Sequence, residues 1–115
     1  MGIQRYEGNG RMSKAVVHND TIYLCGQVGS TEGDIKEQTR ETLEKVEKLL
    51  VQHGSDKDHI LSAVIHLKDI ALFSEMNQVW DNWIQNGSEP ARTCVEAKLA
   101  SEKLLVEVTV IAALK

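Results

Sequence analysis

Two segments near the C-terminal end of the sequence alternate as β-strands do, yet they carry apolar side chains on both faces. The first runs from Ala91 to Leu99, and Pro90 gives it an extended start. The second runs from Leu104 to Leu114. Helices of the same chain can cover only one face of a sheet, so we expect the other face to be buried against further copies of the chain. These segments therefore predict a sheet-containing fold that oligomerises.

Each of these segments also contains a charged residue where charges are rare: Arg92 in the first and Glu107 in the second. A short turn at 100–103 predicts that the two segments form a hairpin. A guanidinium can bind a carboxylate through two parallel hydrogen bonds, and a nearby glutamate can accept a proton or orient a water. The pair therefore suggests a site for a small carboxylic acid that reacts with water. The alternative, which the hairpin alone favours, is a cross-strand salt bridge on a solvated sheet face.

The rest of the sequence has the patterns of two amphipathic helices and three further strands. Asp34 is a suitable N-cap for the first helix, and Gly54 is a suitable stop after His53. The predicted order is β-β-α-β-α-β-β, an α+β fold with two helices on one face of a mixed sheet. The predicted strands before the last two are 14–18, 21–26 and 61–67, and the predicted helices are 35–53 and 72–86.

Apolar residues recur in both predicted helices with a helical period, so we expect both stripes to lie in the core. Two tryptophans in the second stripe could stack on bases, but at this spacing a core role is the better interpretation. The first stripe comprises Ile35, Leu43, Val46, Leu49 and Leu50, with Thr39 between them, and the second comprises Phe73, Met76, Val79, Trp80, Trp83 and Ile84.

Length and charge restrict the function further. The 115 residues suit one domain, 1–115. The net charge of −4 and the lack of a basic run argue against an extended nucleic-acid-binding surface. No apolar run has the length of a membrane span, and the polar segment 1–11 lacks a secretory signal. Cys25 and Cys94 have no CxxC spacing, which is typical of a cytoplasmic chain with reduced thiols. The four histidines form no HxH or HxxxH pair, so we expect no metal site.

Four separated segments resemble, in order and spacing, the RidA family, also called YjgF-like or L-PSP proteins. They are the stretch PARTCVE at 90–96, Val106-Glu107-Val108, Cys25-Gly26-Gln27, and the pattern of Phe73, Met76-Asn77 and Trp80. The resemblance implies a chorismate-mutase-like fold and a homotrimer with three clefts between subunits. It also implies hydrolysis of reactive 2-enamine and 2-imine acids, such as 2-aminoacrylate, to 2-keto acids and ammonia, without a metal or organic cofactor.

Carried over by position, the resemblance makes Arg92 the group that binds the substrate carboxylate and Glu107 the group that orients the reacting water. Cys94 matches a cysteine whose backbone lines the pocket, and Gly26 and Asn77 match other pocket-lining positions. No covalent nucleophile is needed, so Cys94 is expected to act as a small buried residue.

Two positions depart from the archetypal members. Met12 stands where those members have a tyrosine, and Thr93 is larger than the usual residue after the arginine. The loss of a polar pocket group suggests a sibling subgroup with an altered substrate range. Two other functions stay open: a non-catalytic trimer that binds small carboxylates as a sensor, and an endoribonuclease, against which the acidic charge and the lack of a basic groove argue.

Overall fold

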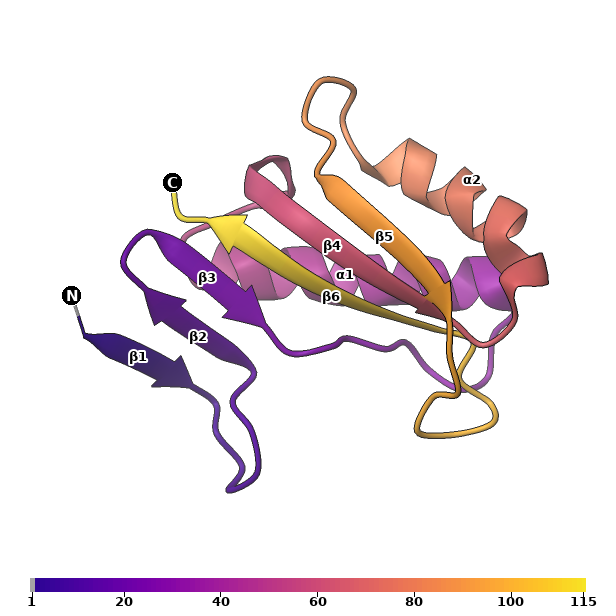
Figure 1. Ribbon diagram of the computed structural model, residues 1–115, viewed down its shortest axis with the longest axis horizontal. Coiled ribbons are helices and arrows are strands. Elements are labelled where there is room, and N and C mark those ends of the chain that lie inside the picture. Colours follow the sequence, from indigo (N-terminus) through magenta and orange to yellow (C-terminus); the bar gives the residue numbers. More distant parts are fainter. Residues whose placement is uncertain (1) are drawn as a thin grey trace.

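The computed structural model describes residues 2–115, and within them six strands and two α-helices follow one another in the predicted order, with one additional strand at the start (Figure 1). Strand β1 lies in the polar N-terminal segment. Its four residues have no apolar alternation and are mostly exposed, so the sequence carries no signal for it. The elements are β1 (Ile3–Tyr6), β2 (Ala15–His18), β3 (Thr21–Leu24), α1 (Ile35–Gln52), β4 (Ile60–Leu67), α2 (Phe73–Trp83), β5 (Ala91–Glu96) and β6 (Val106–Ala113).

All six strands form one mixed sheet in the order β1-β2-β3-β6-β4-β5. The predicted hairpin between β5 and β6 is wrong. Strand β5 pairs in parallel with β4 at the edge of the sheet, and β6 lies between β3 and β4, antiparallel to both. The reason is that α2 connects β4 to β5 as a crossover, which requires parallel strands, and the chain between β5 and β6 then returns past β4.

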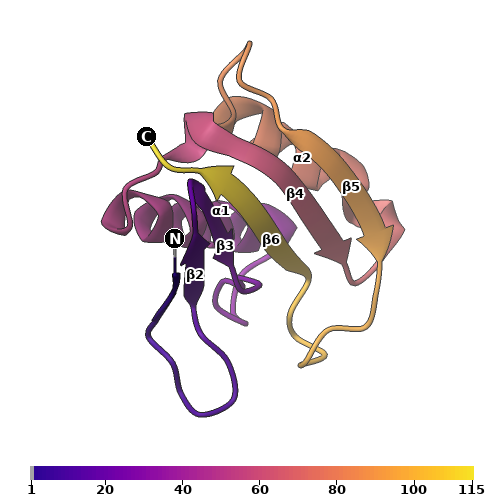
Figure 2. The ribbon, with the colours of Figure 1, turned by 60° about the vertical axis from the view of Figure 1, so that its left-hand side comes forward.

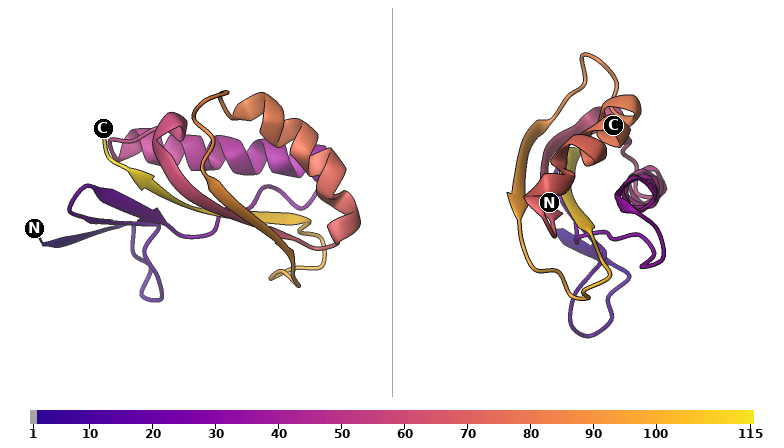
Figure 3. Two further views of the ribbon diagram at one scale, coloured as in Figure 1. Left: turned by 45° about the horizontal axis from the view of Figure 1, so that its top comes forward. Right: turned by 90° about the vertical axis from the view of Figure 1, so that its right-hand side faces the viewer.

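Both helices lie on the same side of the sheet, as predicted (Figure 3). Helix α1 lies behind β3 and β6, and α2 lies behind β4 and β5 (Figure 2). The predicted stripe of α1 is buried, and so are Met76 and Trp80 of α2. Phe73 is an exception, because 39% of it is exposed at the start of α2.

The ends of the helices follow local signals to different extents. Asp34 caps α1 as predicted, since its Oδ1 accepts a hydrogen bond of 2.9 Å from the backbone N–H of Glu37. Gly54 follows the helix with a φ of +89°, a left-handed conformation that suits glycine. Helix α2 ends at Trp83, three residues before the predicted end, because Ile84 turns to an extended conformation and packs against the core.

The face of the sheet away from the helices is called the open face here. In β6 the buried residues Val106, Val108 and Val110 face the helices, and the residues between them face the other way, as predicted. The open face carries exposed apolar side chains, among them Tyr23 and Val95. None of the helices in residues 2–115 combines the length and the apolar character that crossing a membrane requires.

Candidate active site

Arg92 lies on the edge strand β5 and projects toward α2. It is in register with Ala63 of β4, a buried residue on the helix-covered face. Its Nη1 donates a hydrogen bond of 2.8 Å to Oδ1 of Asn77, and its guanidinium carbon lies 5.2 Å from the ring centroid of Trp80. The ring of Phe73 is 5.8 Å away on the same helix. An amide and two aromatic rings, all uncharged, therefore hold this half-buried cation in one orientation.

The guanidinium has no acidic partner within residues 2–115. None of the ion pairs formed within residues 2–115 involves Arg92, so the predicted alternative of an Arg92–Glu107 salt bridge is wrong for the single chain. A guanidinium has five N–H donors, and one hydrogen bond to Asn77 leaves most of them available. An incoming carboxylate would supply the charge and acceptors that are missing.

Glu107 lies on the open face of β6 and is in register with His66 of β4. Its carboxylate packs directly on Gly26, just after β3. A Cβ atom at Gly26 would lie 2.6 Å from Oε2 of Glu107 and 2.8 Å from its Cδ, so the position requires glycine for the carboxylate to stay there. The backbone of Gln27 pairs with Val108 through two hydrogen bonds of 2.9 and 3.0 Å, which fixes the 26–27 segment beside Glu107.

Arg92 and Glu107 are thus not neighbours in the folded chain. Strand β4 separates their strands, and they project to opposite faces of the sheet, because Arg92 is level with Ala63 and Glu107 with His66. The predicted residues divide into two groups. Arg92 and Asn77 contact each other on the helix-covered face, and Gly26 and Glu107 contact each other on the open face.

Cys94 follows Arg92 on the same face of β5 and is in register with the buried Ile65. Burial raises the pKa of the Cys94 thiol, and the nearby positive charge of Arg92 opposes this only in part. A thiol with a raised pKa is a poor nucleophile at neutral pH.

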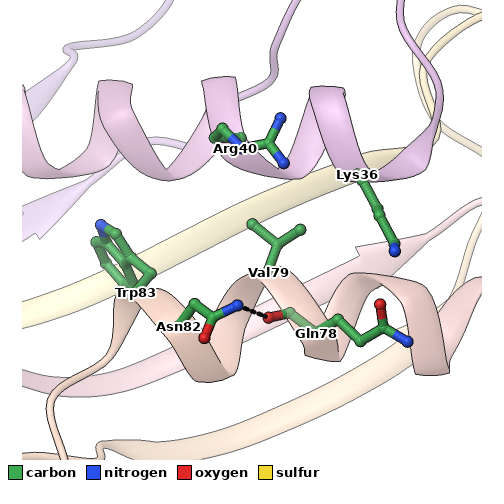
Figure 4. Close-up of a pocket in the computed structure, with 6 residues that line it drawn as sticks. All are labelled: Lys36, Arg40, Gln78, Val79, Asn82 and Trp83. Atoms are coloured by element: carbon green, nitrogen blue, oxygen red, sulfur yellow. Dashed lines mark hydrogen bonds between the residues drawn. The ribbon is translucent and has the colours of Figure 1, made fainter.

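The surface has two hollows of interest, one beside Gly26 and one between the two helices. A cavity of about 470 Å³ includes Gly26 and Met12 in its walls. A smaller groove of about 290 Å³ lies between α1 and α2, with Lys36 and Arg40 on one side and Gln78 and Asn82 on the other (Figure 4). No group of three or more His, Cys, Asp or Glu side chains in the part of the chain that the structure describes is arranged to hold a metal ion.

Sequence reasoning missed the support that Phe73 and Trp80 give to Arg92, since both were assigned to the core. The signal was present, because Phe73, Asn77 and Trp80 follow one another at four and three residues along one helix face. It also missed the lysines that line the cavity beside Gly26, which come from segments far apart in the sequence.

Comparison with known proteins extends over almost the whole chain. The family described as Endoribonuclease L-PSP matches residues 2–114. A RutC family protein of Haemophilus influenzae is 42% identical over 114 residues, covering 97% of this chain and 98% of its own. A solved structure of a YjgF family member from Neisseria meningitidis is 41% identical, with a TM-score of 0.97, and the match covers 100% of this chain and 97% of that one. Its sheet and helices match the α+β arrangement described above.

Proposed function

The chain belongs to the YjgF/RidA/L-PSP family, and on that premise we propose that it hydrolyses reactive 2-imine acids, and the enamines that tautomerise to them, to 2-keto acids and ammonia. The observation that carries this proposal is the guanidinium of Arg92, which is oriented by Asn77 and Trp80 and has no acidic partner within residues 2–115. Such a group is ready to bind the carboxylate of the substrate in a fixed position.

Glu107 is the second functional group of the proposal. Its carboxylate orients a water molecule, and the water oxygen forms a bond to the imine carbon while a water proton passes to the glutamate. The glutamate passes that proton to the imine nitrogen, which completes the carbinolamine. The hydroxyl proton of the carbinolamine then moves to the nitrogen by way of Glu107, and the C–N bond breaks as the C=O bond forms, so one imine and one water give one keto acid and one ammonia. Imines of this kind hydrolyse readily in water, and positioning is therefore sufficient for the acceleration.

The two groups meet only if the site is shared between subunits. Arg92 projects on the helix-covered side of an edge strand, and Glu107 projects from the open face, where apolar side chains such as Tyr23 and Val95 remain exposed. In a cyclic homotrimer, the open face of one subunit is buried and Arg92 of one subunit lies beside Glu107 of the next. Each trimer then has three equivalent sites.

A coupled assay tests the activity. An amino-acid oxidase generates the imine in the cuvette, with catalase present, and the release of keto acid is timed with and without the protein. Glu107→Gln, which is nearly isosteric, is expected to lower turnover by about 10²-fold while keto-acid binding is retained. If the wild-type protein binds keto acids but accelerates no imine hydrolysis, it is a carboxylate-binding protein rather than an enzyme.

Mixed trimers test the shared site. Arg92→Ala and Glu107→Gln chains are each expected to be almost inactive alone. When the two are co-expressed, a site with its arginine from one chain and its glutamate from the other is intact, and random mixing gives about a quarter of the wild-type activity. If the mixed trimers stay inactive, the two residues act within one subunit or not at all.

A further inference from the structure

The cavity beside Gly26 is positively charged, although the chain as a whole is acidic. It has a volume of about 470 Å³, within the range of sites for small ligands, and lies between α1, the end of β3 and the segment before β2. Three lysines and one glutamate line it, a balance of +3 − 1 = +2, whereas the whole chain has a net charge of −4. The charged residues are Glu7, Lys14, Lys45 and Lys48.

Only one of the three lysines forms an ion pair with a neighbouring residue in the described part of the chain. Lys14 is paired with Glu7, because its Nζ lies 3.8 Å from Oε1 of that residue. Lys45 donates a hydrogen bond of 2.9 Å to the backbone carbonyl of Val28, which leaves its charge unpaired. Lys48 forms neither an ion pair nor a hydrogen bond with any group in residues 2–115. Two cations on neighbouring turns of α1 are therefore available to an anion.

The cavity also adjoins the proposed reaction centre. Gly26 forms part of its wall, and the carboxylate of Glu107 packs against the same residue. Met12 lines the cavity as well, and its thioether offers neither a hydroxyl group nor a rigid ring. Gly26 lies between Glu107 on the open face and the cavity, which α1 lines from the helix-covered side, so the side chain of a substrate that reacts beside Glu107 reaches the two lysines only past Gly26.

We propose that this cavity makes the protein prefer 2-imino acids whose side chain ends in a second carboxylate. The inference rests on the function proposed above. The α-carboxylate binds at Arg92 of one subunit, the imine carbon lies near Glu107 of the next, and the side-chain carboxylate extends past Gly26 toward Lys48 and Lys45. An apolar side chain of the same length would leave both lysines without a partner and so gain less from the cavity.

The experiment compares two five-carbon substrates that differ only in the terminal group. Glutamate oxidase generates 2-iminoglutarate, and an amino-acid oxidase acting on norvaline generates 2-iminopentanoate. The ratio of the two kcat/KM values measures the preference, and wild type is expected to favour the diacid about tenfold at low salt, less at high salt. Lys48→Gln is expected to lower the ratio about threefold to fivefold, and Lys48→Glu about tenfold or more.

Lys36→Gln is the matched control, because Lys36 lies on the same helix but lines the groove between α1 and α2 (Figure 4). It is expected to leave the ratio at the wild-type value, and an equal fall in this variant would show only a general effect of charge. Calorimetric binding of 2-oxoglutarate and 2-oxopentanoate gives a second readout that does not depend on turnover.

The outcomes separate the two proposals. If wild type hydrolyses both imines with equal kcat/KM and Lys48→Glu does not change the ratio, the inference is overturned and the proposed activity stands. If neither imine is hydrolysed faster than without protein, the proposed activity fails. In that case equal affinity for the two keto acids overturns the charged cavity too, whereas a preference for 2-oxoglutarate that Lys48→Glu abolishes supports it.

Discussion

An alanine at position 26 would place a methyl group where the side chain of Glu107 now lies. The added Cβ would be 2.6 Å from Oε2, 2.8 Å from Cδ and 3.1 Å from Cγ of that glutamate. Carbon atoms prefer a separation of about 3.5–4.0 Å, so the carboxylate has to move by about 1 Å. A displacement of that size at a reacting group can cost about 10²-fold in rate, and we expect kcat of Gly26→Ala to fall by this factor.

Folding should tolerate the same change. Gly26 is not among the glycines with positive φ, so alanine can adopt its backbone conformation without strain. The atoms that must move belong to the far end of a flexible side chain. Because alanine also restricts the unfolded chain, the free energy of unfolding should stay within about 1 kcal/mol of wild type. Thermal unfolding of Gly26→Ala measures this, with Gly2→Ala as the control, since nothing lies within 4 Å of a Cβ at Gly2.

A double-mutant cycle shows whether the loss acts through Glu107. In a Glu107→Gln background the carboxylate has already lost its role, so Gly26→Ala should lower kcat by less than about threefold more. An equal loss in both backgrounds would mean that Gly26 acts on the substrate directly. Full activity of Gly26→Ala would refute the reasoning, because it would show that the position of Glu107 over Gly26 has no part in turnover.

The other predictions concern substrate binding, assembly and the thiol. Arg92→Ala should lower kcat/KM about 10²-fold or more and abolish keto-acid binding, and Arg92→Lys should recover little because an ammonium lacks the planar donors; near-normal kinetics would contradict this. Light scattering should give three times the chain mass of 12.8 kDa, and a monomer would exclude the shared site. In a Cys25→Ser chain, Cys94 should be alkylated more slowly than free cysteine at pH 8, because a raised pKa leaves less thiolate at that pH; an equal rate would contradict it.

Local patterns predicted most of the elements of this fold. Helical periodicity identified the buried face of α1, and the cap at Asp34 and the glycine at 54 set its ends. Alternation correctly separated Val106 and Val108 from Glu107 within β6. These features depend on residues a few positions apart. Strand β1 escaped prediction because its side chains are exposed and only its backbone pairs with β2.

The arrangement of the site depended on contacts that no local pattern contains. The sequence determined that Arg92 and Glu107 lie in strands and which neighbours share their faces. The tertiary structure alone decided that β4 lies between those strands and that the two side chains project to opposite faces. The physical reason is that the α2 crossover makes β5 parallel to β4, and strand order and register arise from long-range pairing and burial rather than from the residues within each strand.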